Sequence, residues 1–358
     1  MQKYILVIFV LILSCVFPYH AMVLSSTDVQ EPIRGIYVNA PTTSKPQFHD
    51  LLSLIKNTDL NAMVIDIKDD QGHLTFTPAK NSPYFSVSRP YILNPSSLMN
   101  TLKANNIYPI ARIVVFKDNM LAAKNPNLSF KTTQGLWKNP RGDSFTNPFL
   151  KEVWDYNIGM AVEAIKLGFK EIQFDYVRFP EKFEKVEMQL IYDKSIFQGD
   201  RVTAVSEFVK YAKEQLSPYN VKVSVDVFGN ATVIPEASGI GQNFTRIAEN
   251  VDIISAMIYP SHWTTIFGIQ KPDLEPYRLV EGYAKVENER LKKITNPPIS
   301  RPWIQDFTAS YLGKGNYKVY GKTEVEEQIR ALHSQGINEF LLWNAANNYT
   351  PNVDYTPY

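Results

Sequence analysis

The sequence of 358 residues predicts an α/β protein, a (β/α)8 or TIM barrel in a single domain, and three observations support this. Eight short apolar runs alternate along the chain with segments of helical periodicity. Connections from helix to strand are short, whereas several connections from strand to helix are long. The hydrophobic share of 44% suffices for one large core. An open doubly wound sheet is the alternative, but no glycine-rich phosphate loop follows the first strand.

The predicted strands are near-continuous apolar runs, as expected of parallel strands that are covered on both faces. They are RGIYVNA (34–40), AMVIDIKD (62–69), YPIARIVVF (108–116), EIQFDYVRF (171–179), VKVSVDVFG (221–229), DIISAMIYP (252–260), RPWIQDF (301–307) and EFLLWNA (339–345). Predicted helices include 150–168, 200–216, 275–294 and 322–336. Gly168 suits a helix C-cap, and Pro218 follows the end of the second helix.

The long connections are rich in Trp, Tyr, Asn and Gly. They are 117–149, 260–274, 308–321 and the segment after Ala345. In a barrel these connections lie at the C-terminal ends of the strands, where barrel enzymes carry their active sites. Their composition suits stacking on sugars and hydrogen bonding to them. The alternative is that they are surface loops without a function.

The N-terminus predicts an export signal over residues 1–21. Lys3 is followed by about ten apolar residues and then by the small residues Ser14-Cys15, which is the pattern of a signal peptide. The apolar run is too short for a membrane span, which needs about 20 residues. The stretch that ends at Cys15 resembles a bacterial lipobox, so Cys15 is a candidate for lipidation and membrane anchoring. The alternative is ordinary cleavage near Ala21. We expect export to the periplasm or outer surface, or a membrane-anchored lipoprotein.

Residues 22–32 are interpreted as a short linker and residues 33–358 as the barrel. The formal net charge of +1 gives no indication of a nucleic-acid partner. Cys15 is the single cysteine, so the barrel has no thiol for a disulfide, a metal or nucleophilic catalysis. His73 follows two aspartates, but there is no His-x-x-x-His pair and no Gly-x-Ser-x-Gly elbow. We therefore expect neither a metal nor a cofactor.

Strand periodicity places two aspartates inside the predicted barrel. In the strand at 221–229, Asp226 shares a face with Ser224 and Phe228, opposite a face made of valines that suits contact with helices. The same alternation points Asp175 inward. Glycoside hydrolysis needs two carboxyl groups beside the scissile bond. When two acids share one cavity, their pKa values move apart, so that one group stays protonated while the other is ionised. Asp175 and Asp226 are therefore candidate catalytic residues.

Further polar residues lie near the same strand ends. Arg178 either keeps a neighbouring carboxylate ionised or binds substrate, and a structural salt bridge to Asp175 is the alternative. Asp66 and Asp69 are substrate-binding candidates, although a Lys68–Asp66 pair inside the barrel is an equal alternative.

The aromatic candidates divide by position. Trp137 and Trp263 lie in predicted active-face loops, which favours stacking on substrate. Trp343 lies in a strand, where a core role is the commoner one. Tyr259, Trp343 and Asn344, at strand ends, complete the substrate-binding candidates.

The quoted strands resemble a known family. RGIYVNA, NAMVIDIKDDQG, YPIARIVVFKD and above all EIQFDYVRFP resemble the glycosyl hydrolase domain of bacterial exported proteins, which is similar to α-amylase barrels. The resemblance runs from about Arg34 to about Tyr349. It implies a TIM barrel and glycosidase chemistry.

In α-amylase-like barrels an Asp at the end of strand four is the nucleophile, an acid on strand five is the acid/base, and a third Asp follows strand seven. The resemblance assigns these roles to Asp175, Asp226 and Asp306. Amylases have Glu where this chain has Asp226, and Arg where it has Gln173. Glu181, or an acid on another strand, is therefore an alternative acid/base.

The sequence thus predicts an exported glycoside hydrolase that acts on an oligo- or polysaccharide or a cell-envelope glycan, without a cofactor. One alternative is a non-catalytic glycan-binding barrel protein of the cell envelope. Another is a structural envelope lipoprotein whose loops bind proteins. The sequence makes no prediction about oligomeric state.

Overall fold

The computed structural model describes residues 31–194 and 197–357. The predicted export signal with Cys15, and all of the predicted linker except its last two residues, lie outside the described residues. Among the helices that are described, none combines the length and apolar character needed to cross a membrane. The described residues from Pro32 onward form one compact unit.

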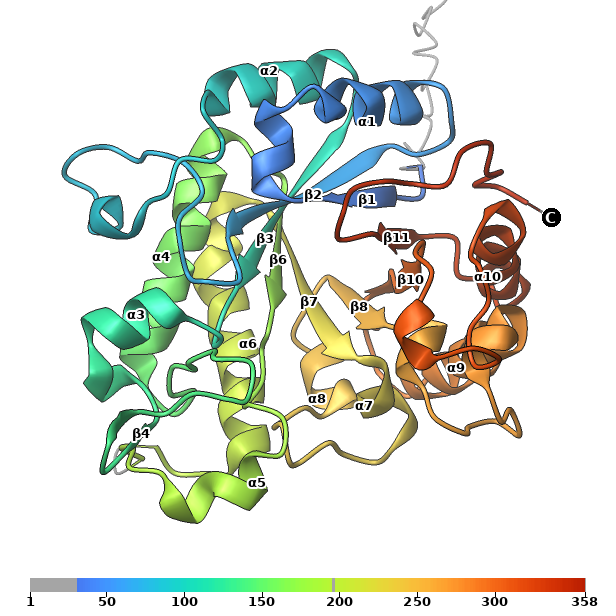
Figure 1. Cartoon of the computed structure of the whole chain (residues 1–358). Coiled ribbons are helices and arrows are strands. Elements are labelled where there is room, and N and C mark those ends of the chain that lie inside the picture. Colours follow the sequence, from blue (N-terminus) through green and yellow to red (C-terminus); the bar gives the residue numbers. More distant parts are fainter. Residues whose placement is uncertain (1–30, 195–196, 358) are drawn as a thin grey trace, which may run out of the picture. The chain divides into compact units, whose positions relative to one another are not determined.

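The predicted barrel is confirmed: within the described part of the chain, eight parallel strands close into a ring surrounded by helices (Figure 1). They are β1 (Arg34–Val38), β2 (Ala62–Lys68), β3 (Tyr108–Val114), β6 (Glu171–Asp175), β7 (Lys222–Phe228), β8 (Ile253–Met257), β10 (Trp303–Gln305) and β11 (Phe340–Trp343). Strand β10 pairs with both β11 and β8, which closes the ring. A short strand, β9 (Ile299–Ser300), extends the pairing of β8 just before β10. Pro302 separates the two pieces because proline has no N–H for a strand ladder.

Helices follow most strands and cover the outside of the ring. The long ones are α1 (Gln47–Lys56), α2 (Pro95–Ala104), α4 (Lys151–Leu167), α6 (Arg201–Leu216), α9 (Pro276–Leu291) and α10 (Lys322–Ser334). The short ones are α3 (Asn119–Lys124), α5 (Phe183–Val186), α7 (Gly229–Val233) and α8 (Phe244–Ala248). Gly168 caps α4 in the left-handed conformation, with φ of 106°, as predicted. A small hairpin, β4 (Lys131–Thr132) with β5 (Gly135–Leu136), lies in the long connection after β3.

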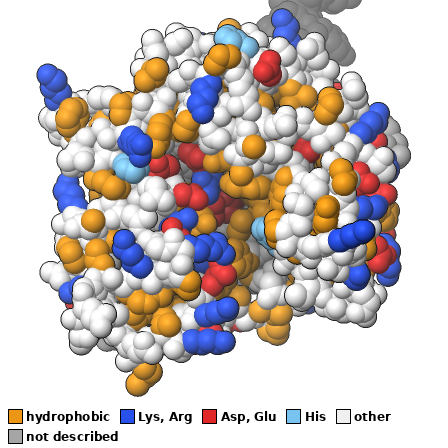
Figure 2. All heavy atoms as spheres, viewed as in Figure 1, with side chains coloured by type: hydrophobic (Ala, Val, Ile, Leu, Met, Phe, Trp, Pro, Cys, Tyr) orange, Lys and Arg blue, Asp and Glu red, His pale blue; other side chains and the backbone are white. Residues whose placement is uncertain are grey.

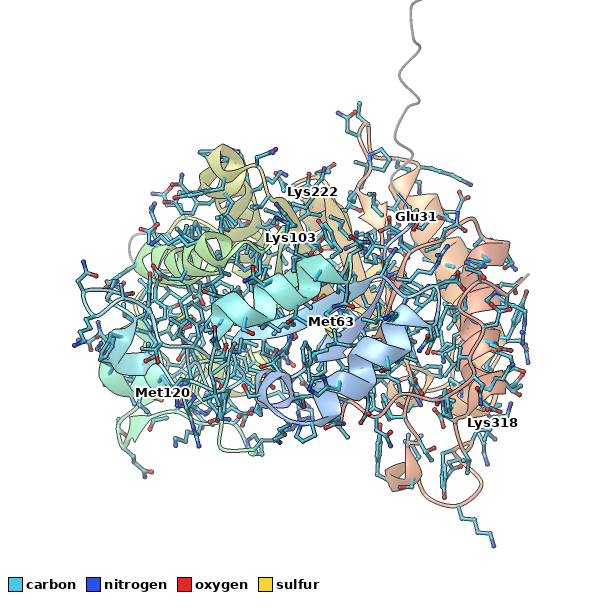
Figure 3. All side chains as sticks on the ribbon, turned by 90° about the horizontal axis from the view of Figure 1, so that it is seen from above. Glu31, Met63, Lys103, Met120, Lys222 and Lys318 are labelled. Carbon is cyan, nitrogen blue, oxygen red and sulfur yellow. The ribbon has the colours of Figure 1, made fainter. Side chains whose placement is uncertain are left out.

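The main core lies between the ring and its helices. Met63 of β2 is fully buried there and lies between α1 and α2 (Figure 3). The valine face of β7 joins the same core, so the opposite face with Asp226 points into the barrel. At the N-terminal end of the barrel, Arg301 binds Glu171 at 2.8 Å and Glu339 at 2.7 Å. This buried ion-pair cluster leaves the C-terminal end as the place for an open cavity.

Candidate active site

A cavity of about 690 Å³ opens at the C-terminal ends of the strands, a volume typical of ligand sites. Figure 2 shows it as a hollow with acidic side chains deep inside, basic ones above and below, and apolar ones along one side. The strands supply Arg112, Asp175, Asp226, Phe228, Met257, Trp303 and Trp343 to its lining. The segments between the strands supply Asp70, Arg141, Tyr176, Arg178, Glu181, Gly229, Asn230, Tyr259, His262, Trp263 and Thr264.

Asp175, the last residue of β6, is held by an arginine from the neighbouring strand. Arg112 of β3 donates to Asp175 Oδ2 from Nε at 3.0 Å and from a terminal guanidinium nitrogen at 2.6 Å. The backbone N–H of Tyr176 donates to Asp175 Oδ1 at 2.5 Å. Tyr176 has φ of +52°, a left-handed conformation that is costly for a residue with a large side chain. The backbone thus turns sharply just after the carboxylate, as is common at functional sites.

Arg112 also neutralises two further acids. It donates to Asp66 Oδ1 at 2.7 Å and to Asp70 Oδ1 at 3.1 Å. Burial lowers the pKa of Arg112, but the carboxylates of Asp175 and Asp66 outweigh this effect and raise it well above its ordinary value. Burial raises the pKa of Asp66 to about 6, although Arg112 opposes that shift. The guanidinium therefore stays charged beside Asp175.

Asp226 lies in a different environment. It is 2% exposed, and Trp303 Nε1 donates to its Oδ1 at 2.8 Å. Burial, and then the negative charge of Asp175, raises the pKa of Asp226 well above its ordinary value. One cavity thus combines an aspartate bound to a cation with a buried aspartate whose pKa is raised. Acid-assisted bond cleavage uses two carboxyl groups in such different environments.

Aromatic rings form one wall of the cavity. Trp343 stacks on Tyr37, with ring centroids 4.2 Å apart, and meets Trp303 edge-on at 5.6 Å. Trp263 packs against Gly229, where a Cβ atom would lie 2.6 Å from the indole Cζ2. Glycine directly after β7 therefore lets the indole approach the floor of the cavity. Rings held in this way can stack on the apolar face of a sugar.

The structure brings together six of the site residues that the sequence predicts: Asp175, Asp226, Arg178, Tyr259, Trp263 and Trp343. Two pairings that the sequence offered as alternatives do not form. Arg178 makes no ion pair with Asp175, since the partner of Asp175 is Arg112. Lys68 pairs with Asp118 at 2.6 Å and not with Asp66.

The remaining candidates do not line the cavity. Asp66 lies behind Arg112 and accepts a hydrogen bond from Tyr37 at 2.5 Å. Asp69 accepts from the backbone N–H groups of Gln71 and His73, so it holds a turn. Trp137 packs on the main core.

Asp306 and Asn344 organise the C-terminal segment. Both carboxylate oxygens of Asp306 accept hydrogen bonds from Thr350, at 2.5 Å and 3.0 Å. The amide nitrogen of Asn344 donates to the backbone carbonyls of Asp306 and Asn348. These contacts account for both side chains structurally, and we leave Asp306 out of the proposed catalytic pair.

Sequence reasoning missed Arg112, Asp70, Arg141 and His262. Arg112 lies within the apolar run at 108–116. An isolated buried cation is costly, so an arginine in such a strand indicates a buried acidic partner nearby. Among the described residues, no group of three or more His, Cys, Asp or Glu side chains is arranged to hold a metal ion.

Replacing Arg112 with Met is expected to lower the free energy of unfolding at neutral pH by about 3–5 kcal/mol, because several buried carboxylates lose their counter-charge. The loss should shrink as pH falls, since protonation removes the unpaired charges. Urea unfolding at several pH values measures it. Arg301→Met is the control, because Arg301 is also buried between carboxylates but lies at the other end of the barrel. Only the Arg112 variant should change the pH dependence of hydrolysis, and equal changes in both would contradict its role at the site.

Comparisons with known proteins agree with the barrel fold. The family model described as "Putative glycosyl hydrolase domain" matches residues 35–349. The glycoside hydrolase domain of PgaB (BpsB) from Bordetella bronchiseptica is 16% identical with a TM-score of 0.60, over 88% of this chain and 95% of that one. The spore cortex-lytic enzyme SleL from Bacillus megaterium QM B1551 is 13% identical with a TM-score of 0.52, over 89% of this chain and 71% of that one.

A hypothetical protein from Ruminiclostridium thermocellum ATCC 27405 is 32% identical over 54% of this chain and 97% of its own, with a TM-score of 0.47. None of the curated proteins matches the sequence. The structures of PgaB (BpsB) and SleL support the barrel fold, and the family match covers nearly all of the described residues. The chain therefore belongs to the family described as "Putative glycosyl hydrolase domain", and its class of chemistry is that of a glycoside hydrolase.

Proposed function

We propose that the protein cleaves glycosidic bonds in this cavity, with Asp175 as nucleophile and Asp226 as general acid/base. The observation that carries the proposal is a pair of carboxyl groups with different partners in one cavity: Asp175 bound to Arg112, and Asp226 buried beside Trp303. Glycoside hydrolysis by two carboxyl groups uses one ionised and one protonated member.

The proposed reaction has two steps. The protonated Asp226 gives its proton to the leaving oxygen while Asp175 attacks the anomeric carbon and forms a glycosyl ester. Asp226, now ionised, takes a proton from water as the water attacks the same carbon and releases Asp175. Arg112 binds Asp175 Oδ2, whereas the one hydrogen bond to Oδ1 from the described residues comes from the Tyr176 N–H, so Oδ1 is the proposed attacking atom. Two displacements retain the anomeric configuration, which NMR of the first product measures.

The proposed substrate is a polysaccharide or a cell-envelope glycan. The wall formed by Tyr259, Trp263 and Trp343 supports it, because such rings offer stacking surfaces to sugar units. The test is a panel of purified glycans, in which released reducing ends are measured for the wild-type protein and for Asp175→Asn. Glycan binding without any release, equal in both proteins, would instead favour a non-catalytic glycan-binding barrel.

We also propose that the chain is exported and that Cys15 is lipidated. Mass spectrometry of the protein from membranes of the expressing bacterium is expected to show an N-terminus at Cys15 with an attached diacylglycerol. Cys15→Ser should move the protein from the membrane fraction to the soluble one. A mature N-terminus near Met22, with the same distribution between membrane and soluble fractions for the wild-type and Cys15→Ser proteins, would contradict lipidation but not export.

A further inference from the structure

Two buried arginines line the cavity, and their surroundings differ. Arg112 faces three carboxylates at hydrogen-bond distance. Arg178 makes only two hydrogen bonds among the described residues: one to the carbonyl of Phe179 at 3.1 Å, and one to Glu181 Oε1 at 3.4 Å. The side chain of Glu181 is 48% exposed. A guanidinium has five N–H donors, so Arg178 keeps donors available for a ligand.

Arg178 is also fixed in place. It is 5% exposed and lies over the rings of Tyr176 and Phe228, 4.7 Å and 4.6 Å from their centroids. Burial lowers the pKa of Arg178, and its anionic neighbours do not offset that effect. For Arg112 the neighbouring carboxylates do offset it. A buried cation with too little counter-charge costs stability, unless a bound anion supplies the rest.

A second cation adds to the imbalance. Arg141, in the connection between β5 and α4, is exposed and lines the same cavity. No acidic group of the described residues lies within 4.0 Å of it, and its charge is one of those that lower the pKa of Arg178. His262, which also lines the cavity, has its pKa lowered by burial and is neutral at pH 7. Glu181, half exposed, is therefore the one acid of the described residues that pairs with either guanidinium, while Asp175 acts on Arg178 only from a greater distance.

We propose that Arg178 and Arg141 form a subsite for a carboxylate of the substrate, so that the glycan is acidic. This inference rests on the proposed function of the cavity. The planar guanidinium of Arg178, held against two rings, suits paired hydrogen bonds to a carboxylate. The carboxylate would supply the counter-charge that Glu181 provides only in part. It belongs either to a uronic acid or to an acid joined to an amino sugar through an ether.

The test measures binding by the Asp175→Asn protein, so that turnover does not interfere. Uronic-acid polysaccharides are compared with the same polymers after reduction of their carboxyl groups, and muramic-acid glycan strands are compared with chitin oligomers. At least one acidic member should bind about tenfold more tightly than its neutral counterpart, with the difference shrinking at high salt. The pair that shows the difference identifies the source of the carboxylate. Equal or tighter binding of the neutral members, or no binding of any acidic member, would overturn the inference.

Variants in the connection before α4 measure the contribution of the Arg141 guanidinium to binding. Arg141→Gln, added to Asp175→Asn, should weaken binding of the acidic glycan about tenfold and leave its neutral counterpart unchanged. Lys138→Gln is the matched control, because Lys138 is an exposed cation of the same loop that does not line the cavity. Arg178→Lys should lose affinity as well, since it keeps the charge but not the planar fork. Identical affinities for the Arg141 and Lys138 variants would also overturn the subsite.

The outcomes for this subsite and for the catalytic proposal are separable. Hydrolysis of a neutral glycan by the wild-type protein, with no preference for acidic ones, would remove the carboxylate subsite and keep the catalytic pair. Tight binding of an acidic glycan that the wild-type protein never cleaves would keep the carboxylate subsite and remove the catalytic pair.

Discussion

Replacing Asp175 with Asn is expected to reduce kcat/KM for glycan hydrolysis on the order of 10⁴-fold. The amide cannot form the glycosyl ester that the proposed mechanism requires. Its oxygen can still accept the N–H of Tyr176, and Arg112 keeps its contacts with Asp66 and Asp70, so the fold should persist. Release of reducing ends from the glycan that the panel identifies measures the loss, and circular dichroism checks the fold.

Asp306→Asn is the informative comparison. Asp306 is also a buried aspartate just beyond a strand end, but its oxygens bind Thr350 and it does not line the cavity. Its replacement should lower the free energy of unfolding by about 1–3 kcal/mol and leave hydrolysis near the wild-type rate. Loss of hydrolysis in both variants would restore the role that the α-amylase resemblance gives Asp306. Full activity of Asp175→Asn would contradict its assignment as nucleophile.

Strand periodicity predicts the barrel and the inward direction of its acids where strands are regular. Asp226 lies within β7, so the alternation that places valines against helices also points Asp226 inward. The same rule fails beyond a strand end. Strand β6 ends at Asp175, and the left-handed turn at Tyr176 redirects the chain before Arg178. The Asp175–Arg178 pair, which proximity in sequence offered as an alternative, therefore does not form.

The true partner of Asp175 depends on strand register, which one sequence does not reveal. Arg112 of β3 is the register partner of Gln173 on the neighbouring strand β6. Gln173 is the inward-facing residue that precedes Asp175 on β6. α-Amylase-like barrels have an arginine at the position of Gln173, and here the neighbouring strand supplies one at the same level. From the sequence alone Gln173 is a departure from that pattern, because Arg112 and Asp175 lie 63 positions apart and meet only once the sheet has formed.

The second large effect concerns Asp226. Asp226→Asn is expected to lower kcat/KM for natural glycans by about 10²–10⁴-fold, because the leaving oxygen no longer receives a proton. The asparagine oxygen can still accept the N–H of Trp303, so the cavity should keep its shape. A dinitrophenyl glycoside of the same sugar has a leaving group that departs without a proton, and its first step should be nearly unaffected. A burst of dinitrophenol followed by slow turnover, faster with added azide, is the expected signature.

The pH profile gives a second test of the same role. The acid must be protonated, so kcat/KM of the wild-type protein should fall as pH rises through the pKa of Asp226. Because burial and Asp175 raise that pKa well above its ordinary value, this fall should come well above the pH range in which an exposed aspartate ionises. Asp226→Asn should abolish this fall of kcat/KM with rising pH for the dinitrophenyl substrate. Glu181→Gln is the matched control, since Glu181 is the alternative acid and is half exposed beside Arg178. If Glu181→Gln gives the burst and loses the fall while Asp226→Asn keeps both wild-type behaviours, the proton donor is Glu181, and Asp226 only shapes the cavity.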